Sequence, residues 1–426
     1  MKKILAFALA VAMLIAFAGC SASIKDGGYP GVAEAGYMSD GYNGTDQIQA
    51  GQMTAAELKD LKDADKWIAK FVSTQEGKSI WEKDIATWEF KVPVKVFKIK
   101  VVDKTGNPAY GQKITLAYTD SITDSNMKYE SYAVSDVNGE AVLFGTNPDT
   151  IYSLLLPEGS TAKEEDGIHV VTIPSAVTPK KLDLLFMVDT TGSMGDELDF
   201  LKAELKNVVS RVAAADQSFD IRVSVNFYRD DGDDYVVREF AFTGDIDKVV
   251  KDISAQSFSG GGDFPEAVHK ALTAVVTKQD WRSDAVKLCM LVLDAPPHTE
   301  NEVKGVSQSL QNSISAAAEK GIRIIPVTAS GIDDTTEHLM RYFAVMTGGT
   351  YVFITGHSGI GGEHKDPDTD EEYTIEYLNE CLIRIISEYC NIPYVCQKEF
   401  VPAVTSETEE QTTEIPQETE TTEAAG

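Results

Sequence analysis

The chain has 426 residues, which is long enough for two or three domains with hydrophobic cores of their own. Its formal net charge is -29, from 38 Lys and Arg against 67 Asp and Glu. This balance argues against nucleic acid and anionic lipid headgroups as partners, because phosphate binding needs a basic face.

Residues 1–20 have the pattern of an export signal. A charged start is followed by an apolar run over residues 4–17, which is shorter than the about 20 residues needed to span a bilayer. The run ends at Cys20 in a sequence that resembles a bacterial lipobox, with Phe17 where Leu is more usual. This resemblance implies lipidation of Cys20 and a lipid-anchored protein at the cell surface, facing outside the cytoplasm; ordinary signal cleavage is the alternative.

Two short segments separate the signal from the first folded domain. Residues 21–53 are rich in Gly, Tyr, Asp and Ser without periodicity, which is typical of a flexible tether. Residues 54–86 are predicted to form a short helical region, because Thr54 and Glu57 have the spacing of a capping box and apolar residues then recur at helical spacing. The aromatic residues of this region are expected to pack on a neighbouring domain.

Residues 87–176 change to a two-residue alternation of apolar side chains, broken by polar turns such as 103–108 and 136–140. Short strands with such turns predict a small antiparallel β-sandwich. Its turn-rich runs resemble the Ig-like or carboxypeptidase-regulatory-like modules of bacterial surface proteins. The resemblance implies a spacer or a binding module.

Residues 180–396 are predicted to form an α/β domain that ends in a C-terminal helix. The run from Leu184 to Val188 is apolar without alternation, which is typical of a strand buried on both faces of a parallel sheet. Further strands, such as 221–228 and 288–293, alternate with helical patterns. The predicted fold class is therefore α/β, with a doubly wound, mostly parallel, Rossmann-like sheet preceded by the smaller β-sandwich.

Oxygen-bearing side chains gather where the first of these strands ends. Asp189, Thr191 and Ser193 alternate along the turn, so one carboxylate and two hydroxyls can converge on one point. Hard oxygen donors suit a small hard cation such as Mg²⁺, which takes few protein ligands and keeps several waters. Two more acids, Asp263 after a run of glycines and Asp294 at a strand end, can complete the site, since ligands gather at the carboxyl edge of such sheets.

These residues resemble the metal-ion-dependent adhesion site (MIDAS) of von Willebrand factor A (VWA) domains. The D-x-[ST]-x-S motif matches from Asp189 to Ser193, the threonine-loop position falls at Asp263, and the last acid falls at Asp294. The resemblance implies that Thr191 and Ser193 bind Mg²⁺, or alternatively Ca²⁺ or Mn²⁺, directly. Asp189 and Asp294 would then act largely through waters, and Asp263 directly or through water.

One position departs from the adhesive members of this family, which commonly have a threonine where this chain has Asp263. A neutral set of direct ligands leaves the cation electrophilic for an acidic side chain of a partner, whereas a further carboxylate partly neutralises it. The sequence therefore supports metal binding more directly than capture of an acidic ligand.

Other residues in loops at the same edge are candidates for partner contact, although loop histidines are often simply solvated. They are Tyr228, Arg229, Asp230, His298 and His364. The glycines of residues 356–364 follow neither G-x-G-x-x-G nor Walker spacing, which argues against a nucleotide. Cys390 and Cys396 flank a Pro-containing turn and can pair in an oxidising compartment.

Residues 397–426 are expected to form a disordered acidic tail, because they are rich in Thr and Glu and cannot bury enough apolar surface to fold. The sequence as a whole predicts an exported, membrane-anchored adhesion or interaction protein rather than an enzyme. Its VWA-type domain would engage a protein or glycan partner through the cation. The alternatives are a cell-envelope assembly scaffold with a structural metal, and a metal-assisted hydrolase, against which the lack of a general base argues.

Overall fold

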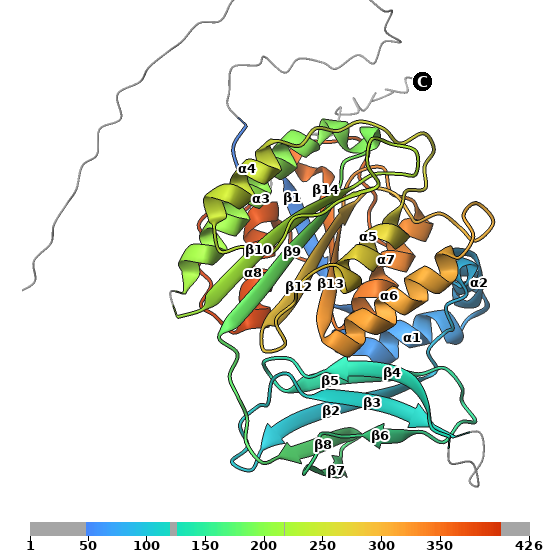
Figure 1. Ribbon diagram of the computed structural model, residues 1–426. Coiled ribbons are helices and arrows are strands. Elements are labelled where there is room, and N and C mark those ends of the chain that lie inside the picture. Colours follow the sequence, from blue (N-terminus) through green and yellow to red (C-terminus); the bar gives the residue numbers. More distant parts are fainter. Residues whose placement is uncertain (1–47, 120–125, 217, 402–426) are drawn as a thin grey trace, which may run out of the picture. The chain divides into compact units, whose positions relative to one another are not determined.

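The computed structural model describes residues 48–119, 126–216 and 218–401, and only the backbone of Asp196 (Figure 1). The signal at residues 1–20 with Cys20, nearly all of the tether and the tail from residue 402 lie outside the described residues. Within the described ranges, no helix combines the length and the apolar character needed to cross a membrane.

The α/β domain contains an eight-stranded sheet with the order β11-β10-β9-β12-β13-β14-β1-β15. Seven of its strands lie within residues 181–377, and β1 comes from a segment earlier in the chain. Its five central strands run parallel, and the three others pair antiparallel at the two edges. The mostly parallel α/β sheet predicted from the sequence is therefore confirmed. The central strands are β9 (Lys181–Asp189), β10 (Asp220–Tyr228), β12 (Val286–Leu293), β13 (Ile322–Thr328) and β14 (Tyr351–Thr355), and the others are β11 (Val237–Arg238), β1 (Thr54–Leu58) and β15 (Glu376–Tyr377).

Two hydrophobic layers cover the two faces of this sheet (Figure 1). Alternate residues of β9 face opposite layers, so that Leu185 packs on one side and Phe186 on the other. One face is covered by α5 (Val268–Thr277), α6 (Val306–Lys320) and α7 (Asp334–Thr347), and the other by α3 (Leu198–Ala215), α4 (Ile246–Ser254) and α8 (Leu378–Cys390). Burial on both faces explains why β9 is apolar without alternation.

The segment before the first helices differs from the expectation. Thr54–Leu58 forms strand β1 against β14 instead of the start of a helix. The Thr54 hydroxyl contacts the Thr355 hydroxyl at 2.8 Å, and Glu57 is paired with Arg384 at 2.8 Å instead of closing a capping box. The carboxylate of Glu204 on α3 accepts the backbone N–H groups of residues 51–53, which fixes the approach to β1. Long-range pairing thus overrides a local capping pattern.

Helices do follow β1 within this region. They are α1 (Ala64–Val72) and α2 (Gln75–Asp84), with short 3-10 turns η1 (Asp60–Asp63) and η2 (Ala86–Trp88). Their aromatic side chains pack against α7, as predicted: the ring of Tyr342 lies 5.6 Å from Trp81 and 6.5 Å from Trp67. Arg341 on α7 also pairs with the buried Asp60 at 2.7 Å, and the Trp88 indole donates to the carbonyl of His298, in the loop after β12, at 2.8 Å.

A β-rich region precedes the α/β domain and contains two sheets, with the strand orders β5-β2-β8-β7 and β4-β3-β6. A separate small core lies between them, built on side chains such as Val101, Ile114 and Leu143. The strands are not all antiparallel as predicted, because β2 and β8 pair in parallel. After β5 the chain crosses to the second sheet again for β6 and returns through the β7-β8 hairpin, which places β8 alongside β2 in the same direction. The strand bounds are β2 (Lys95–Asp103), β3 (Lys113–Tyr118), β4 (Lys128–Val134), β5 (Glu140–Gly145), β6 (Ser153–Leu155), β7 (Thr161–Glu165) and β8 (Ile168–Ile173).

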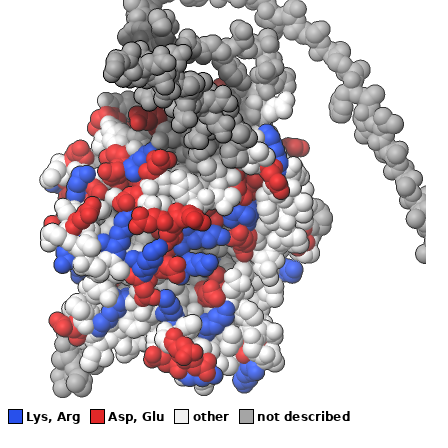
Figure 2. All heavy atoms as spheres, turned by 180° about the vertical axis from the view of Figure 1, so that it is seen from behind, with Lys and Arg blue, Asp and Glu red and all other residues white. Residues whose placement is uncertain are grey.

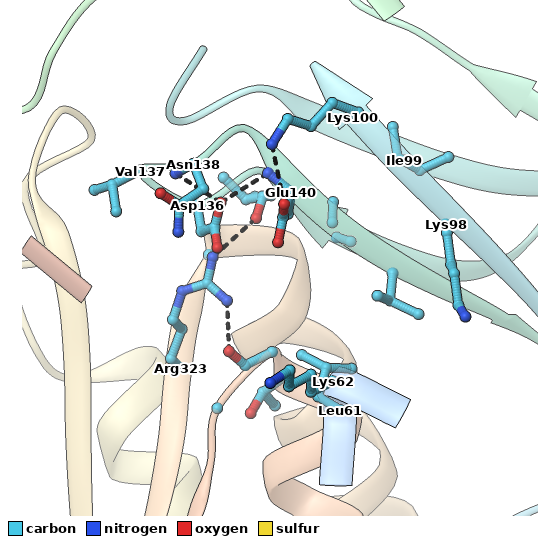
Figure 3. Close-up of a pocket in the computed structure, with 18 of the residues that line it drawn as sticks. Leu61, Lys62, Lys98, Ile99, Lys100, Asp136, Val137, Asn138, Glu140 and Arg323 are labelled. Atoms are coloured by element: carbon cyan, nitrogen blue, oxygen red, sulfur yellow. Dashed lines mark hydrogen bonds and ion pairs between the residues drawn. The ribbon is translucent and has the colours of Figure 1, made fainter. Parts of the chain in front are cut away.

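A cavity of about 850 Å³ lies where the β-rich region meets the beginning of β13 (Figure 3). Two of its charged side chains are engaged within the lining: Lys100 pairs with Glu140 at 3.0 Å, and Arg323 donates to the carbonyls of Gly348 and Val134. Figure 2 shows a face of the molecule on which basic side chains lie among acidic ones. The net negative charge is therefore not concentrated in a single acidic patch on that face.

Candidate metal centre

Three parallel strands bring their carboxyl ends together at one edge of the sheet. Asp189 is the last residue of β9 and is paired in register with Tyr228, the last residue of β10. On the other side of β9, Asp294 directly follows the end of β12. The sheet therefore places Asp189 between the other two side chains, at the edge where open α/β sheets bind ligands.

In the turn after β9, the predicted ligands Asp189, Thr191 and Ser193 contact one another. One carboxylate oxygen of Asp189, Oδ1, accepts the Thr191 backbone N–H at 2.8 Å and the Thr191 hydroxyl at 2.7 Å. The Thr191 hydroxyl also lies 3.2 Å from that of Ser193, in the 3-10 turn η3 (Gly192–Asp196). The second oxygen of Asp189, Oδ2, is buried without a hydrogen-bond partner. A carboxylate and two hydroxyls thus do converge, with one carboxylate oxygen left over.

The glycine-rich loop that follows α4 crosses this turn. The backbone N–H of Ser259 donates to the Thr190 carbonyl, and the Gly260 carbonyl accepts from Gly192, both at 3.1 Å. Gly260 has φ +85°, and a Cβ atom there would lie 2.2 Å from a carboxylate oxygen of Asp233. The close approach and the positive φ both require glycine at this position. Beneath the loop, Asp189 and Thr191 are fully buried, whereas Ser193 is exposed.

The same loop carries Asp263 outward. Its side chain is exposed, and among the described residues it makes no hydrogen bond or ion pair. The residue that turns back toward the site is Glu266, which sequence reasoning missed. Glu266 is 2% exposed and its Oε2 has no hydrogen-bond partner. No motif spacing marks it; the only signal was an acid shortly before a helix that follows a glycine run.

Burial and mutual repulsion shift the titration of these groups. Burial, and then the neighbouring charge of Asp294, raises the pKa of Asp189 to about 7. Burial, and then the charges of Asp189 and Asp230, raises the pKa of Glu266 to about 9. The Tyr228 hydroxyl lies among the same carboxylates, and its pKa is raised well above its usual value by burial and by Asp189. The edge therefore gathers acidic groups that water does not solvate, and without a cation they hold protons to a higher pH than usual.

The residues expected to contact a partner are mostly interior. Tyr228, Arg229, Asp230 and His298 are each less than 8% exposed. His298 Nε2 lies 2.7 Å from Asp230 Oδ1, and Arg229 donates to the Ser257 carbonyl at 2.8 Å, so these side chains brace the loops of the edge instead of facing solvent. Their burial corrects the expectation that these side chains contact a partner directly. The sequence alone does not show which side chains the loops of this edge cover.

His364 contacts other residues of the protein, and the two cysteines, Cys390 and Cys396, are not paired with each other. The His364 ring donates to the Ile360 carbonyl at 2.8 Å and lies 3.5 Å from Glu197. Cys390 is buried at the end of α8 and Cys396 is exposed, and both are free thiols in the structure. Their pairing under oxidising conditions stays a prediction.

The donor set fits a hard divalent cation. In the part of the chain that the structure describes, no three side chains of His, Cys, Asp or Glu come close enough to hold a metal by themselves. A cation at this edge would therefore depend on the hydroxyls of Thr191 and Ser193 and on waters held by the carboxylates. Mg²⁺ usually keeps several waters and uses few protein ligands. The unpartnered Asp189 Oδ2 provides an acceptor for such a water.

Comparison with known proteins identifies the α/β domain. Residues 183–357 match the model of the von Willebrand factor type A domain. The chain is 31% identical over 126 residues to an ariadne-like RING finger protein of Acanthamoeba polyphaga mimivirus, and 24% identical over 175 residues to the alpha-protein kinase vwkA of Dictyostelium discoideum. These matches cover 29% and 39% of this chain, but they span only 12% and 28% of those relatives.

Among solved structures, the conserved hypothetical protein BatB from Bacteroides thetaiotaomicron matches 49% of this chain and 99% of its own, with 12% identity and a TM-score of 0.34.

Because the folded protein holds extra protons at this edge, metal-free protein should lose stability as the pH rises from about 4 to about 9. The pKa of Glu266 is about 9 in the folded protein and near 4.5 in the unfolded chain. The pKa of Asp189 is likewise raised on folding, to about 7. The stabilisation is complete below the unfolded pKa values and is lost as the pH rises through the folded ones. The free energy of unfolding by urea, measured in EDTA at several pH values for wild type and Glu266→Gln, tests this pH dependence.

The wild type should lose stability relative to Glu266→Gln across this window, because glutamine cannot ionise. A stability difference that is independent of pH would contradict the assignment of a buried, protonated Glu266.

Proposed function

Because residues 183–357 form a von Willebrand factor type A domain, we propose that this protein is an exported, lipid-anchored interaction protein whose A-type domain binds a divalent cation and engages a protein or glycan partner at the metal edge. Domains of this type are generally interaction modules without enzymatic activity. Mg²⁺ is the proposed cation, with Ca²⁺ or Mn²⁺ as the other hard cations that the oxygen donors suit.

The observation that carries the proposal is the buried, unpartnered Oδ2 of Asp189 beside two converging hydroxyls. A buried carboxylate oxygen without a donor is costly, and a cation with its waters satisfies it. Thr191 and Ser193 would bind the cation directly, while Asp189 and Asp294 would hold its waters. Ser193 is exposed, so this side of the site can be reached by a partner's oxygen atom.

Export and anchoring rest on the residues before the described part of the chain. The charged start, the short apolar run and the lipobox-like end at Cys20 support lipidation at that residue. Residues 21–53 would then separate the domains from the membrane surface, and β1 is the first described strand after them.

A scaffold in cell-envelope assembly with a purely structural metal is the second candidate. It is favoured by the complete burial of Asp189 and Thr191 under the glycine-rich loop. A metal-assisted hydrolase is less well supported, because His298, a histidine of this edge, is 5% exposed and a substrate has little access to it.

Chelation separates the first two candidates. If the cation itself binds the partner, binding of the purified protein to protein and glycan arrays should be present with Mg²⁺ and abolished by EDTA or by Asp189→Ala. Asp280→Ala is the matched control, because the Asp280 side chain is 98% exposed, and it should bind as wild type. Partner binding that persists in EDTA would support the scaffold and contradict metal-dependent capture.

Lipidation is tested by metabolic labelling with a palmitate analogue. The wild type should incorporate the label and fractionate with membranes, and Cys20→Ala should do neither, because the acylated thiol is absent. Equal labelling of the two proteins would remove the lipid anchor from the proposal.

A further inference from the structure

The cavity where the β-rich region meets β13 lies at the other end of the α/β sheet from the candidate metal centre (Figure 3). Arg323 stands at the amino end of β13, and residues 348–350 lead into β14, whereas the metal centre lies at carboxyl ends of strands. The volume of about 850 Å³ falls within the about 300–1,000 Å³ that small-molecule sites usually have, and such sites occur preferentially where domains meet. The cavity is therefore a candidate site for a second ligand.

One wall of the cavity is the outward face of the sheet that contains β2. Ile99 belongs to the core of the β-rich region, so its neighbours Lys98 and Lys100 point the other way, into the cavity. The adjacent strands add Val142 on β5, in register with Lys98, and Val170 on β8, in register with Lys100. This wall thus combines apolar side chains with two lysines.

The facing wall is also apolar in part. Leu61 follows β1 in the turn η1, and Met346 lies near the end of α7. Both side chains are only partly buried, and they pack against the same hydrophobic layer of the α/β domain as Val142 does. Apolar surface therefore continues from this layer into the cavity on both walls. The apolar part of a ligand is favoured there, because it removes this surface from water.

Arg323 gives the cavity a buried positive charge. Its residue is 8% exposed, and its guanidinium group donates to the carbonyls of Gly348 and Val134 and stacks on the ring of Tyr389 at 5.3 Å. All these partners are neutral, and in the described ranges of the chain Arg323 forms no ion pair. A buried cation with neutral partners alone favours an anion beside it.

The acids of the lining do not supply this anion. Asp136 accepts the backbone N–H groups of Asn138 and Glu140, and burial raises its pKa although the charge of Arg323 acts in the opposite direction. The Glu140 carboxylate pairs with Lys100 at 3.0 Å. The other acids pair with lysines or are exposed: Glu57 and Glu388 pair with Lys59, Glu165 pairs with Lys163, and Asp166 is exposed at the turn between β7 and β8.

Lys62 adds a second positive charge on the same wall as Arg323. Figure 3 shows both side chains on the wall that faces β2. The Lys62 side chain is exposed, and within the part of the chain that the structure describes it makes no hydrogen bond or ion pair. Lys98, across the cavity, pairs with Asp65, which does not line it. An anionic group in the cavity would therefore meet Arg323 within and Lys62 nearer the solvent.

We propose that this cavity binds an amphipathic monoanion, with its apolar body between Leu61, Val142 and Met346 and its single anionic group directed to Arg323 and Lys62. A single charge is favoured because the acids of the lining repel any further negative charge. The inference goes beyond the proposed function, since it requires neither a cation nor a partner at the metal edge.

Three probes with the same alkyl chain test the ligand chemistry by titration calorimetry on the purified full-length protein in detergent-free buffer. Octanoate is the anion, 1-octanol is neutral and octylammonium is the cation. Octanoate should bind at one site, and 1-octanol should bind about 10- to 100-fold more weakly, the change expected when a charge-assisted hydrogen bond is lost. Octylammonium should bind more weakly still. No saturable binding of octanoate, or binding of 1-octanol or octylammonium as tight as that of octanoate, would overturn the proposal.

Charge variants test the two cations. Arg323→Gln can still donate to the carbonyls but has no charge, so it should weaken octanoate by about 10-fold or more and leave 1-octanol unchanged. Lys62→Gln should weaken octanoate about two- to fivefold, because an exposed ion pair contributes little. Lys78→Gln is the control, since Lys78 is an exposed lysine of α2 that does not line the cavity, and it should bind as wild type. Unchanged octanoate affinity in both cavity variants would contradict the assignment of the anionic group.

A filling variant tests the location independently of charge and of the folding of Arg323→Gln. Val170→Trp places a large side chain in the cavity and should abolish saturable binding of octanoate and 1-octanol alike. Val177→Trp is the matched control, because Val177 is 73% exposed and does not line the cavity, and it should bind as wild type. Thermal unfolding first establishes that each variant is folded. Octanoate binding that survives in folded Val170→Trp would place the ligand elsewhere and overturn the proposal.

Discussion

The concentration of buried negative charge at the carboxyl ends of β9 and β12 is the constraint on which the rest of this edge depends. Asp189 and Asp294 repel each other, and Glu266 adds a third buried acid. The glycine-rich loop passes close to acids of this edge, because a Cβ atom at Gly260 would collide with Asp233 and one at Gly261 with Glu266. A site that stores charge in this way is stable only when protons or a cation offset it.

The sheet provides the rigid frame for this edge. Two hydrophobic layers fix β9 from both faces, and β1 extends the sheet on the far side of β14, held by Glu204 and Arg384. The helices that follow β1 pack on α7, and the Trp88 indole contacts the carbonyl of His298. Segments far apart in the sequence therefore support the loop from Asp294 to His298, which in turn positions Glu266.

Sequence reasoning was strongest where one pattern had one physical meaning. The unalternated run that ends at Asp189 predicted a central parallel strand, and the structure confirms the sheet. Prediction was weaker where distant contacts decide the outcome: Thr54 pairs with β14 in spite of its capping pattern, and β8 joins β2 in parallel. Glu266 and Asp263 are only three residues apart, and the sequence does not show which one the loop buries. The carboxyl-edge geometry was predictable, but the choice between these acids was not.

Calorimetric titration of Mg²⁺ into metal-free wild type and Asp189→Ala tests the central claim most directly. We expect saturable binding at one site in the wild type and none in the variant, because Asp189 provides the buried acceptor at the centre of the edge. Asp280→Ala, which removes an exposed acid, should bind like the wild type. Equal binding by the wild type and Asp189→Ala, or no binding by either, would contradict the account.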